Sequence, residues 1–97
     1  MNGKQRAYLR SMCNTLPVII FVGKEGVTDT LVQSVSEALE ARELIKMGVQ
    51  RTADLTAREA CELVCQRTEA EPVQCIGNKF SIYRPRKENP EIVLPRA

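Results

Sequence analysis

A lysine held between two glycines is the feature of this chain best suited to chemistry. Residues 23–26 read Gly-Lys-Glu-Gly, directly after the apolar run 18–22 and before a helix start at Thr28. Glycines let the backbone come close to a ligand, and the amides that begin a helix favour an anion. This GxxG segment therefore predicts a phosphate-binding loop between a strand and a helix, with a plain strand-to-helix turn as the alternative.

Basic side chains are concentrated toward the two ends of the chain. Residues 1–24 carry a charge of +4, residues 25–78 carry −5 and residues 79–97 carry +3, which together give the net charge of +2. If the two ends and the GxxG segment meet in space, the protein has one basic surface and an acidic back, which suits a polyanionic partner. A scattered set of solvated charges is the alternative.

The cysteines and the absence of histidine limit the other chemistry that the chain could perform. There is no CxxC pair and no histidine to complete a zinc set, so we expect no metal and no cofactor. Nothing in the sequence indicates secretion, and the cysteines are expected to be buried free thiols. These are Cys13, Cys61, Cys65 and Cys75.

An enzyme is a poor fit to this sequence. The GxxxxGK[ST] and GxGxxG nucleotide-binding patterns are absent, and without histidine no ordinary general base works near neutral pH. We therefore predict no catalytic residues and a binding protein. No apolar run approaches the length of a membrane span, and we expect a cytoplasmic protein with no membrane contact.

Hydrophobic periodicity predicts the elements that position the GxxG segment. We expect helices over residues 4–16, 28–41 and 56–68, and strands over residues 18–22, 43–51, 73–76 and 80–83. The order α-β-α-β-α-β-β with right-handed crossovers predicts an α/β fold. The expected sheet is four-stranded, mixed and mostly parallel, closed by one antiparallel hairpin strand, with helices mainly on one face.

The same patterns predict which side chains are buried. The strand at 18–22 is apolar throughout and is expected to be buried on both faces, so Phe21, like Phe80, is assigned to the core. Tyr83 is expected to pack rather than to stack on a base. One domain is expected, with a core of about residues 3–84 and an extended tail over residues 85–97, of which residues 92–94 can pack on the body.

Four segments together resemble the CRM domain, a family named for chloroplast RNA splicing and ribosome maturation. They are residues 4–10, 23–26, 43–46 and 77–84, in order over nearly the whole chain. Stand-alone bacterial members of that family are associated with precursors of the large ribosomal subunit, and plant members occur in group II intron splicing factors. The family is similar in fold to the C-terminal domain of bacterial translation initiation factor three.

The resemblance implies RNA binding, with the GxxG loop acting like the loop with which KH domains clamp backbone nucleotides. Carried over to this sequence, the implied RNA-binding residues are Arg6, Arg10, Gly23, Lys24, Gly26, Lys46, Lys79 and Arg84, and Lys4 and Glu25 in the same segments complete the predicted site. Two positions depart from the family pattern. Arg42 stands where histidine is common, and Met47-Gly48 replaces a valine and a charged residue, so that Gly48 removes a contact.

We therefore predict a monomer that binds ribosomal RNA in large-subunit precursors during ribosome assembly, through the GxxG loop and a basic face. With four aromatic residues in the chain, shape and phosphate recognition are expected to dominate over base stacking. Arg58 and Arg67, on the third predicted helix, are expected to lie away from the basic face. A protein-interaction adaptor on the ribosome or in translation, without direct RNA clamping, is the alternative.

Overall fold

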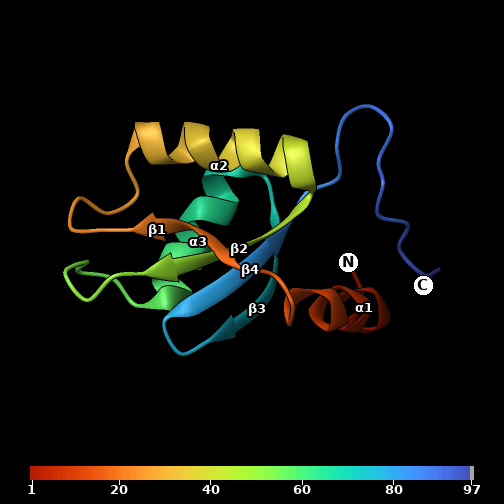
Figure 1. The fold of residues 1–97 in the computed structure, drawn as a ribbon, viewed down its shortest axis with the longest axis horizontal. Helices are drawn as coiled ribbons and strands as arrows, with labels where there is room; N and C mark the ends of the chain where they lie inside the picture. The colour runs from red at the N-terminus through yellow and green to blue at the C-terminus, as the bar shows by residue number, and fades with distance from the viewer. Residues whose placement is uncertain (97) are drawn as a thin grey trace.

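Helices and strands alternate along the chain until a final hairpin of two strands. The computed structural model describes residues 1–96 (Figure 1). Its elements are α1 (Gly3–Cys13), β1 (Val18–Val22), α2 (Asp29–Arg42), β2 (Leu44–Val49), α3 (Ala57–Thr68), β3 (Glu71–Ile76) and β4 (Lys79–Tyr83). The predicted order and the α/β class are confirmed. Among these residues no helix is both long enough and apolar enough to cross a membrane.

The four strands form one mixed sheet in the order β1-β2-β4-β3. β1 and β2 pair in parallel, whereas β4 runs antiparallel to both β2 and β3. The expectation of a mostly parallel sheet closed by the hairpin strand was wrong, because β4 is inserted between β2 and β3. Its buried Phe80 and Ile82 suit a central position, while Pro72 of β3 lacks an amide hydrogen and suits an edge strand.

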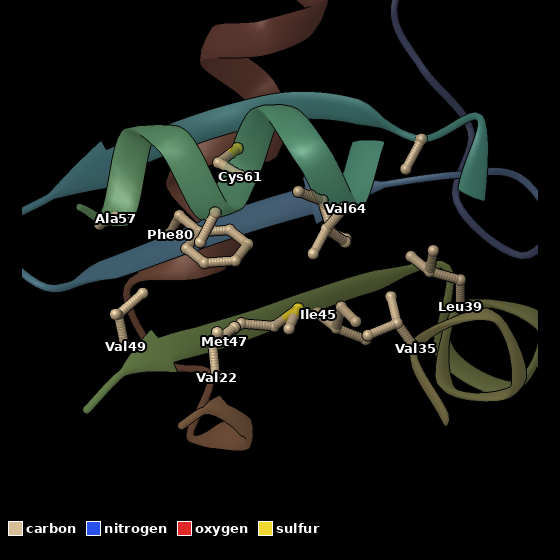
Figure 2. Close-up of a cluster of buried hydrophobic side chains, with 13 residues drawn as sticks. Val22, Val35, Leu39, Ile45, Met47, Val49, Ala57, Cys61, Val64 and Phe80 are labelled. Carbon is tan, nitrogen blue, oxygen red and sulfur yellow. The ribbon is translucent and has the colours of Figure 1, made fainter. Parts of the chain in front are cut away.

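Alternation along β2 separates the two faces of the sheet. Ile45, Met47 and Val49 point to one side, where α2 and α3 cover them and form the main core (Figure 2). The helices contribute buried Val35, Leu39, Ala60, Cys61 and Val64 to this cluster. Two of the three helices therefore lie on one face, as predicted.

α1 is the exception and packs against the opposite face of the sheet, at one end of it. Its buried Leu9 and Cys13 form a second cluster with Leu44, Val73 and Tyr83. The expectation that Tyr83 packs is confirmed. Leaving the α1 end aside, this face carries eight residues, and we call them the open sheet face. They are Val18, Phe21, Lys46, Gly48, Gln74, Ile76, Lys79 and Ser81.

Two predictions of burial, one for Phe21 and one for the cysteines, are wrong in part. Phe21 is 52% exposed on the open sheet face, so β1 is not buried on both sides and Phe21 does not belong to the core. Cys75 is exposed because it lies on the edge strand β3, and Cys65 is half-buried, whereas Cys13 and Cys61 are buried as expected. All four cysteines are free thiols.

The segment after β4 is irregular and is tied to the body through Glu43. This single residue connects α2 to β2 with a φ of 67°, and its side chain is fully buried. Its carboxylate accepts backbone N–H donors from Arg86 at 3.1 Å, Glu91 at 2.7 Å and Ile92 at 3.0 Å. Burial alone would raise the pKa of Glu43, but the three amides and the charge of Arg86 outweigh burial and hold that pKa below its ordinary value.

The anchored tail also contributes apolar contacts. Ile92 and Leu94 pack against the α1 cluster, which confirms that part of residues 92–94 packs on the body, while Val93 is 79% exposed. The backbone carbonyl of Pro95 accepts a hydrogen bond of 3.0 Å from Nε2 of Gln5. Ala97, the last residue of the predicted tail, lies outside the described residues.

We predict that Glu43→Gln lowers the free energy of unfolding by about 2 kcal/mol at pH 7, because the neutral amide keeps one acceptor oxygen, loses the charge and places an NH2 group where a backbone N–H needs an acceptor. Because the pKa of Glu43 is lowered in the folded state, its carboxylate stabilises the protein at pH values above its ordinary pKa of 4.5. That stabilisation is lost as the pH falls below 4.5 and through the lowered pKa of the folded state. The difference between wild type and variant should therefore shrink at pH 3. Urea unfolding at both pH values measures it.

Glu88→Gln in the same tail is the matched control, because Glu88 is exposed. It should change stability little at either pH. A Glu43→Gln effect equal to that of Glu88→Gln, or one that grows on acidification, would contradict the proposed anchoring.

Candidate nucleic-acid interface

The GxxG segment is a tight turn at the end of β1. The Gly26 amide donates to the Gly23 carbonyl at 2.9 Å, and Gly26 has a φ of 75°. Lys24 and Glu25 occupy the exposed tip between them. A side chain at Gly26 would be strained in this left-handed conformation, so the turn depends on glycine there.

Gly23 is constrained in a different way. A Cβ at Gly23 would lie 2.9 Å from Oε1 of Gln50, which is the movable end of a side chain. The backbone amide of Gln50 donates to the Val22 carbonyl at 2.9 Å and so ties the loop after β2 to the end of β1. The two glycines therefore differ, since the backbone conformation requires glycine only at Gly26.

The start of α2, next to this turn, is already capped. Oγ1 of Thr28 accepts from the Leu31 amide at 3.1 Å, in agreement with the helix start predicted at Thr28. Asp29 follows in the first turn and forms an ion pair of 2.6 Å with Arg67. Because Asp29 places a carboxylate at the positive end of the helix, Lys24 is the stronger attraction for an anion in this region.

Two cross-strand rows bring the predicted lysines onto the open sheet face. Lys46 pairs with Ser81, which pairs with Gln74, and Gly48 pairs with Lys79, which pairs with Ile76. Paired residues of neighbouring strands point to the same side of a sheet. Lys46 and Lys79 therefore lie on one surface, and with Asn14, Gln74 and Ser81 they line a shallow depression.

The α1 cations lie at the other end of the molecule from the GxxG loop (Figure 1). Lys4 and Arg10 are exposed, and Nε of Arg6 donates to the Pro72 carbonyl at 3.2 Å. Arg6 and Arg10 line a groove along β3 together with Arg58 of α3. The expectation that Arg58 lies away from the basic residues was wrong, because α1 and α3 flank the same edge strand.

Arg84 does not join these residues. Its guanidinium donates to the carbonyls of Thr68 at 2.9 Å and Ser36 at 3.0 Å, and it lies 3.5 Å from a carboxylate oxygen of Glu40. The prediction that Arg84 belongs to the basic face is corrected, since its side chain joins α2 to α3. Alternation could have revealed this, because Phe80 and Ile82, at even positions, face the same helices.

The predicted residues thus form two basic areas instead of one continuous face. Gly23, Lys24, Glu25 and Gly26 lie at the end of β1, which pairs with β2, the strand of Lys46, and Lys79 lies one strand further on, in β4. Lys4, Arg6 and Arg10 lie on α1 at the far end. Sequence reasoning missed Phe21, Gln74 and Ile76, which share the open sheet face with the lysines.

Within residues 1–96, no group of three or more His, Cys, Asp and Glu side chains could hold a metal ion. The candidate site consists of the exposed Lys24 and Lys79, the half-buried Lys46, the glycine backbone of the loop and the strand surface between them. Such an arrangement can bind phosphates and flat apolar groups.

Comparison with known proteins identifies relatives over almost the full length of the chain. A model of the CRS1 / YhbY (CRM) domain matches residues 1–84. The chain is 40% identical to "Probable RNA-binding protein YqeI" of Bacillus subtilis, over 98% of this chain and 99% of that protein. It is 30% identical to a protein of Haemophilus influenzae named "RNA-binding protein", over 99% of this chain and 96% of that one.

A solved structure has the same fold. The solution structure of the hypothetical protein SAV1595 from Staphylococcus aureus, a candidate RNA-binding protein, superposes with a TM-score of 0.81 at 39% sequence identity. The match covers 98% of this chain and 99% of that one.

The two loop glycines should respond differently to the same substitution. We predict that Gly26→Ala lowers the free energy of unfolding by about 1 kcal/mol, because alanine is strained at positive φ. Gly23→Ala should cost clearly less, since the Gln50 side chain can move aside. Denaturant unfolding of the two variants measures the difference, and equal losses would contradict the turn geometry.

Proposed function

Because the chain belongs to the CRS1 / YhbY (CRM) domain family, we propose that it binds RNA through the GxxG loop and the lysines of the open sheet face. The observation that carries this proposal is the position of the loop. Lys24 lies at the exposed tip of a glycine turn that leads directly out of β1, and β1 borders the strand of Lys46. Backbone amides and lysines of this kind hold phosphates without reading sequence.

The proposed partner is ribosomal RNA in a precursor of the large ribosomal subunit, in the cytoplasm. We propose that residues 1–97 act as one RNA-binding domain, as a monomer and without catalysis. The relatives from Bacillus subtilis and Haemophilus influenzae both carry the words "RNA-binding protein" in their names. In this proposal Gly26 allows the left-handed backbone conformation of the loop, and Lys24 supplies the positive charge that attracts phosphate.

Arg6 and Arg10 provide a second contact area in this proposal. Their groove also holds Arg58, so three cations border the edge strand β3 against one carboxylate, Glu62. An RNA long enough to leave the open sheet face at β3 can place further phosphates there. Arg84 is excluded from the contact set because its donors are used inside the protein.

A protein-interaction adaptor is the second candidate. The observation that favours it is the acidic character of residues 25–78, which include α2 and α3. In that case the helical side would contact a basic ribosomal protein, and protein-free RNA would not bind. Binding to purified RNA therefore separates the two candidates.

We predict that the wild-type protein binds a short single-stranded RNA, which reaches only the GxxG loop and the open sheet face, with a plot of log K against log salt whose slope is about −2, given three lysine contacts. Lys24→Ala, Lys46→Ala and Lys79→Ala should each lower affinity and flatten the slope by somewhat under one unit. None of the three should change the melting temperature much, because Lys24 and Lys79 are exposed and Lys46 is only half-buried, and lysines at such positions contribute little to stability. A salt titration with one RNA fragment measures all of this.

Lys87→Ala is the matched control, because Lys87 is exposed but lies near the end of α2, away from the open sheet face. Its backbone amide donates a hydrogen bond of 3.2 Å to the Glu40 carboxylate. This variant should keep both affinity and slope. Equal losses from Lys87→Ala and Lys24→Ala would indicate diffuse attraction instead of a defined surface. Absence of RNA binding at low salt would favour the adaptor.

A further inference from the structure

Phe21 is a large aromatic side chain that the core does not use. It lies on β1, two residues before the GxxG loop, and 52% of its surface is exposed. Its neighbour Val22 is fully buried on the other side of the sheet. Exposure of this size leaves a face of the ring available to a ligand.

The Phe21 ring packs against the neighbouring strand β2 at Gly48. A Cβ built on Gly48 would lie 2.9 Å from Cε1 and 3.0 Å from Cδ1 of Phe21, and 3.3 Å from Cγ1 of Val18. Real Cβ atoms essentially never approach another atom as closely as 2.9 Å, and the other two separations are also tight, so the ring occupies the space that a side chain at Gly48 would need. The missing side chain at Gly48 therefore lets the Phe21 ring lie over β2.

The surroundings of this ring are basic and polar. Phe21 pairs with Gly48, which pairs with Lys79, so the ring and the lysine lie two strand spacings apart, roughly 10 Å between backbones. Lys46 lies two residues from Gly48 on the same side. None of the eight residues of the open sheet face is acidic.

We propose that Phe21 is a stacking platform for an unpaired base of single-stranded RNA, with the adjacent phosphates held by Lys24, Lys46 and Lys79. This inference rests on the proposed RNA binding and names the form of RNA that the open sheet face takes. A base in a duplex is already stacked and paired and cannot lie flat on the ring, whereas every unpaired base offers a π-face. The lysines supply charge complementarity for the backbone that carries the base.

A purely structural role for Phe21 makes a different prediction. An aromatic ring that covers a strand glycine stabilises a sheet without any ligand. In that case Phe21→Leu would change stability and leave RNA affinity unaltered. A stacking role requires the opposite, a change in affinity that exceeds any change in the folded fraction.

The first measurement uses the absence of tryptophan from the chain. Phe21→Trp introduces a single fluorophore at the platform, and titration with a short oligouridine at low salt should quench its emission in step with binding. Leu63→Trp is the control, because Leu63 is 40% exposed on α3, on the opposite side of the sheet. Its emission should stay unchanged at the same saturation.

The second measurement compares affinities. Phe21→Leu should weaken binding of the single-stranded oligonucleotide by about ten-fold, while the salt slope stays the same because no phosphate contact is lost. Melting temperatures of both proteins show that each is folded under the assay conditions. An RNA duplex of equal length should lose little affinity from this substitution.

The outcomes distinguish this inference from the proposed function. If Phe21→Leu binds like wild type and the Phe21→Trp emission is not quenched, while Lys24→Ala still weakens binding, the platform is wrong and RNA binding stands. If wild type binds neither oligonucleotide nor duplex at low salt, both proposals fall. Quenching together with the ten-fold loss supports the platform.

Discussion

The register of β2, which decides the face of the sheet to which each of its side chains points, is the constraint on which the rest of the structure depends. Because strand side chains alternate, a shift of one residue would exchange Ile45, Met47 and Val49 with Leu44, Lys46 and Gly48. Only one residue, Glu43, joins α2 to β2, and its amide still bonds the Leu39 carbonyl at 2.7 Å. The carboxylate of Glu43 is buried and accepts the backbone amides of the tail, which fixes the position of this residue. The strand that follows therefore begins in the register that turns Ile45, Met47 and Val49 toward α2 and α3. Core and open sheet face are therefore two consequences of one register.

Sequence reasoning succeeded where the signal was local. The order of elements, the helix start at Thr28 and the presence of a strand within residues 43–51 depend on neighbours a few positions apart, and all three are confirmed. It failed where distant segments decide the outcome. The insertion of β4 between β2 and β3 and the packing of α1 against Leu44, Val73 and Tyr83 depend on contacts between segments far apart in the sequence, which no local pattern states.

The same distinction explains the site residues. The GxxG turn is encoded within four positions and could be predicted, while its use in binding remains a proposal. Alternation with Phe80 and Ile82 indicates the side to which Arg84 points, but its partners in α2 and at the end of α3 are brought together only by the fold. Phe21 was assigned to the core because an all-apolar strand usually has two covered faces, but α1 covers only one end of the sheet. Gly48 looked like a lost contact in sequence, yet in space it makes room for the Phe21 ring.

Mapping the RNA-contacting residues in solution tests the central claim, that the open sheet face and its loop form the binding surface. Backbone amide chemical shifts of the labelled protein, followed during titration with single-stranded RNA, report every segment at once. We expect the largest changes over residues 21–26 and at Lys46, Gly48 and Lys79, with smaller changes along α1. Changes confined to the outer surfaces of α2 and α3, with the loop and strands unaffected, would contradict the proposed surface.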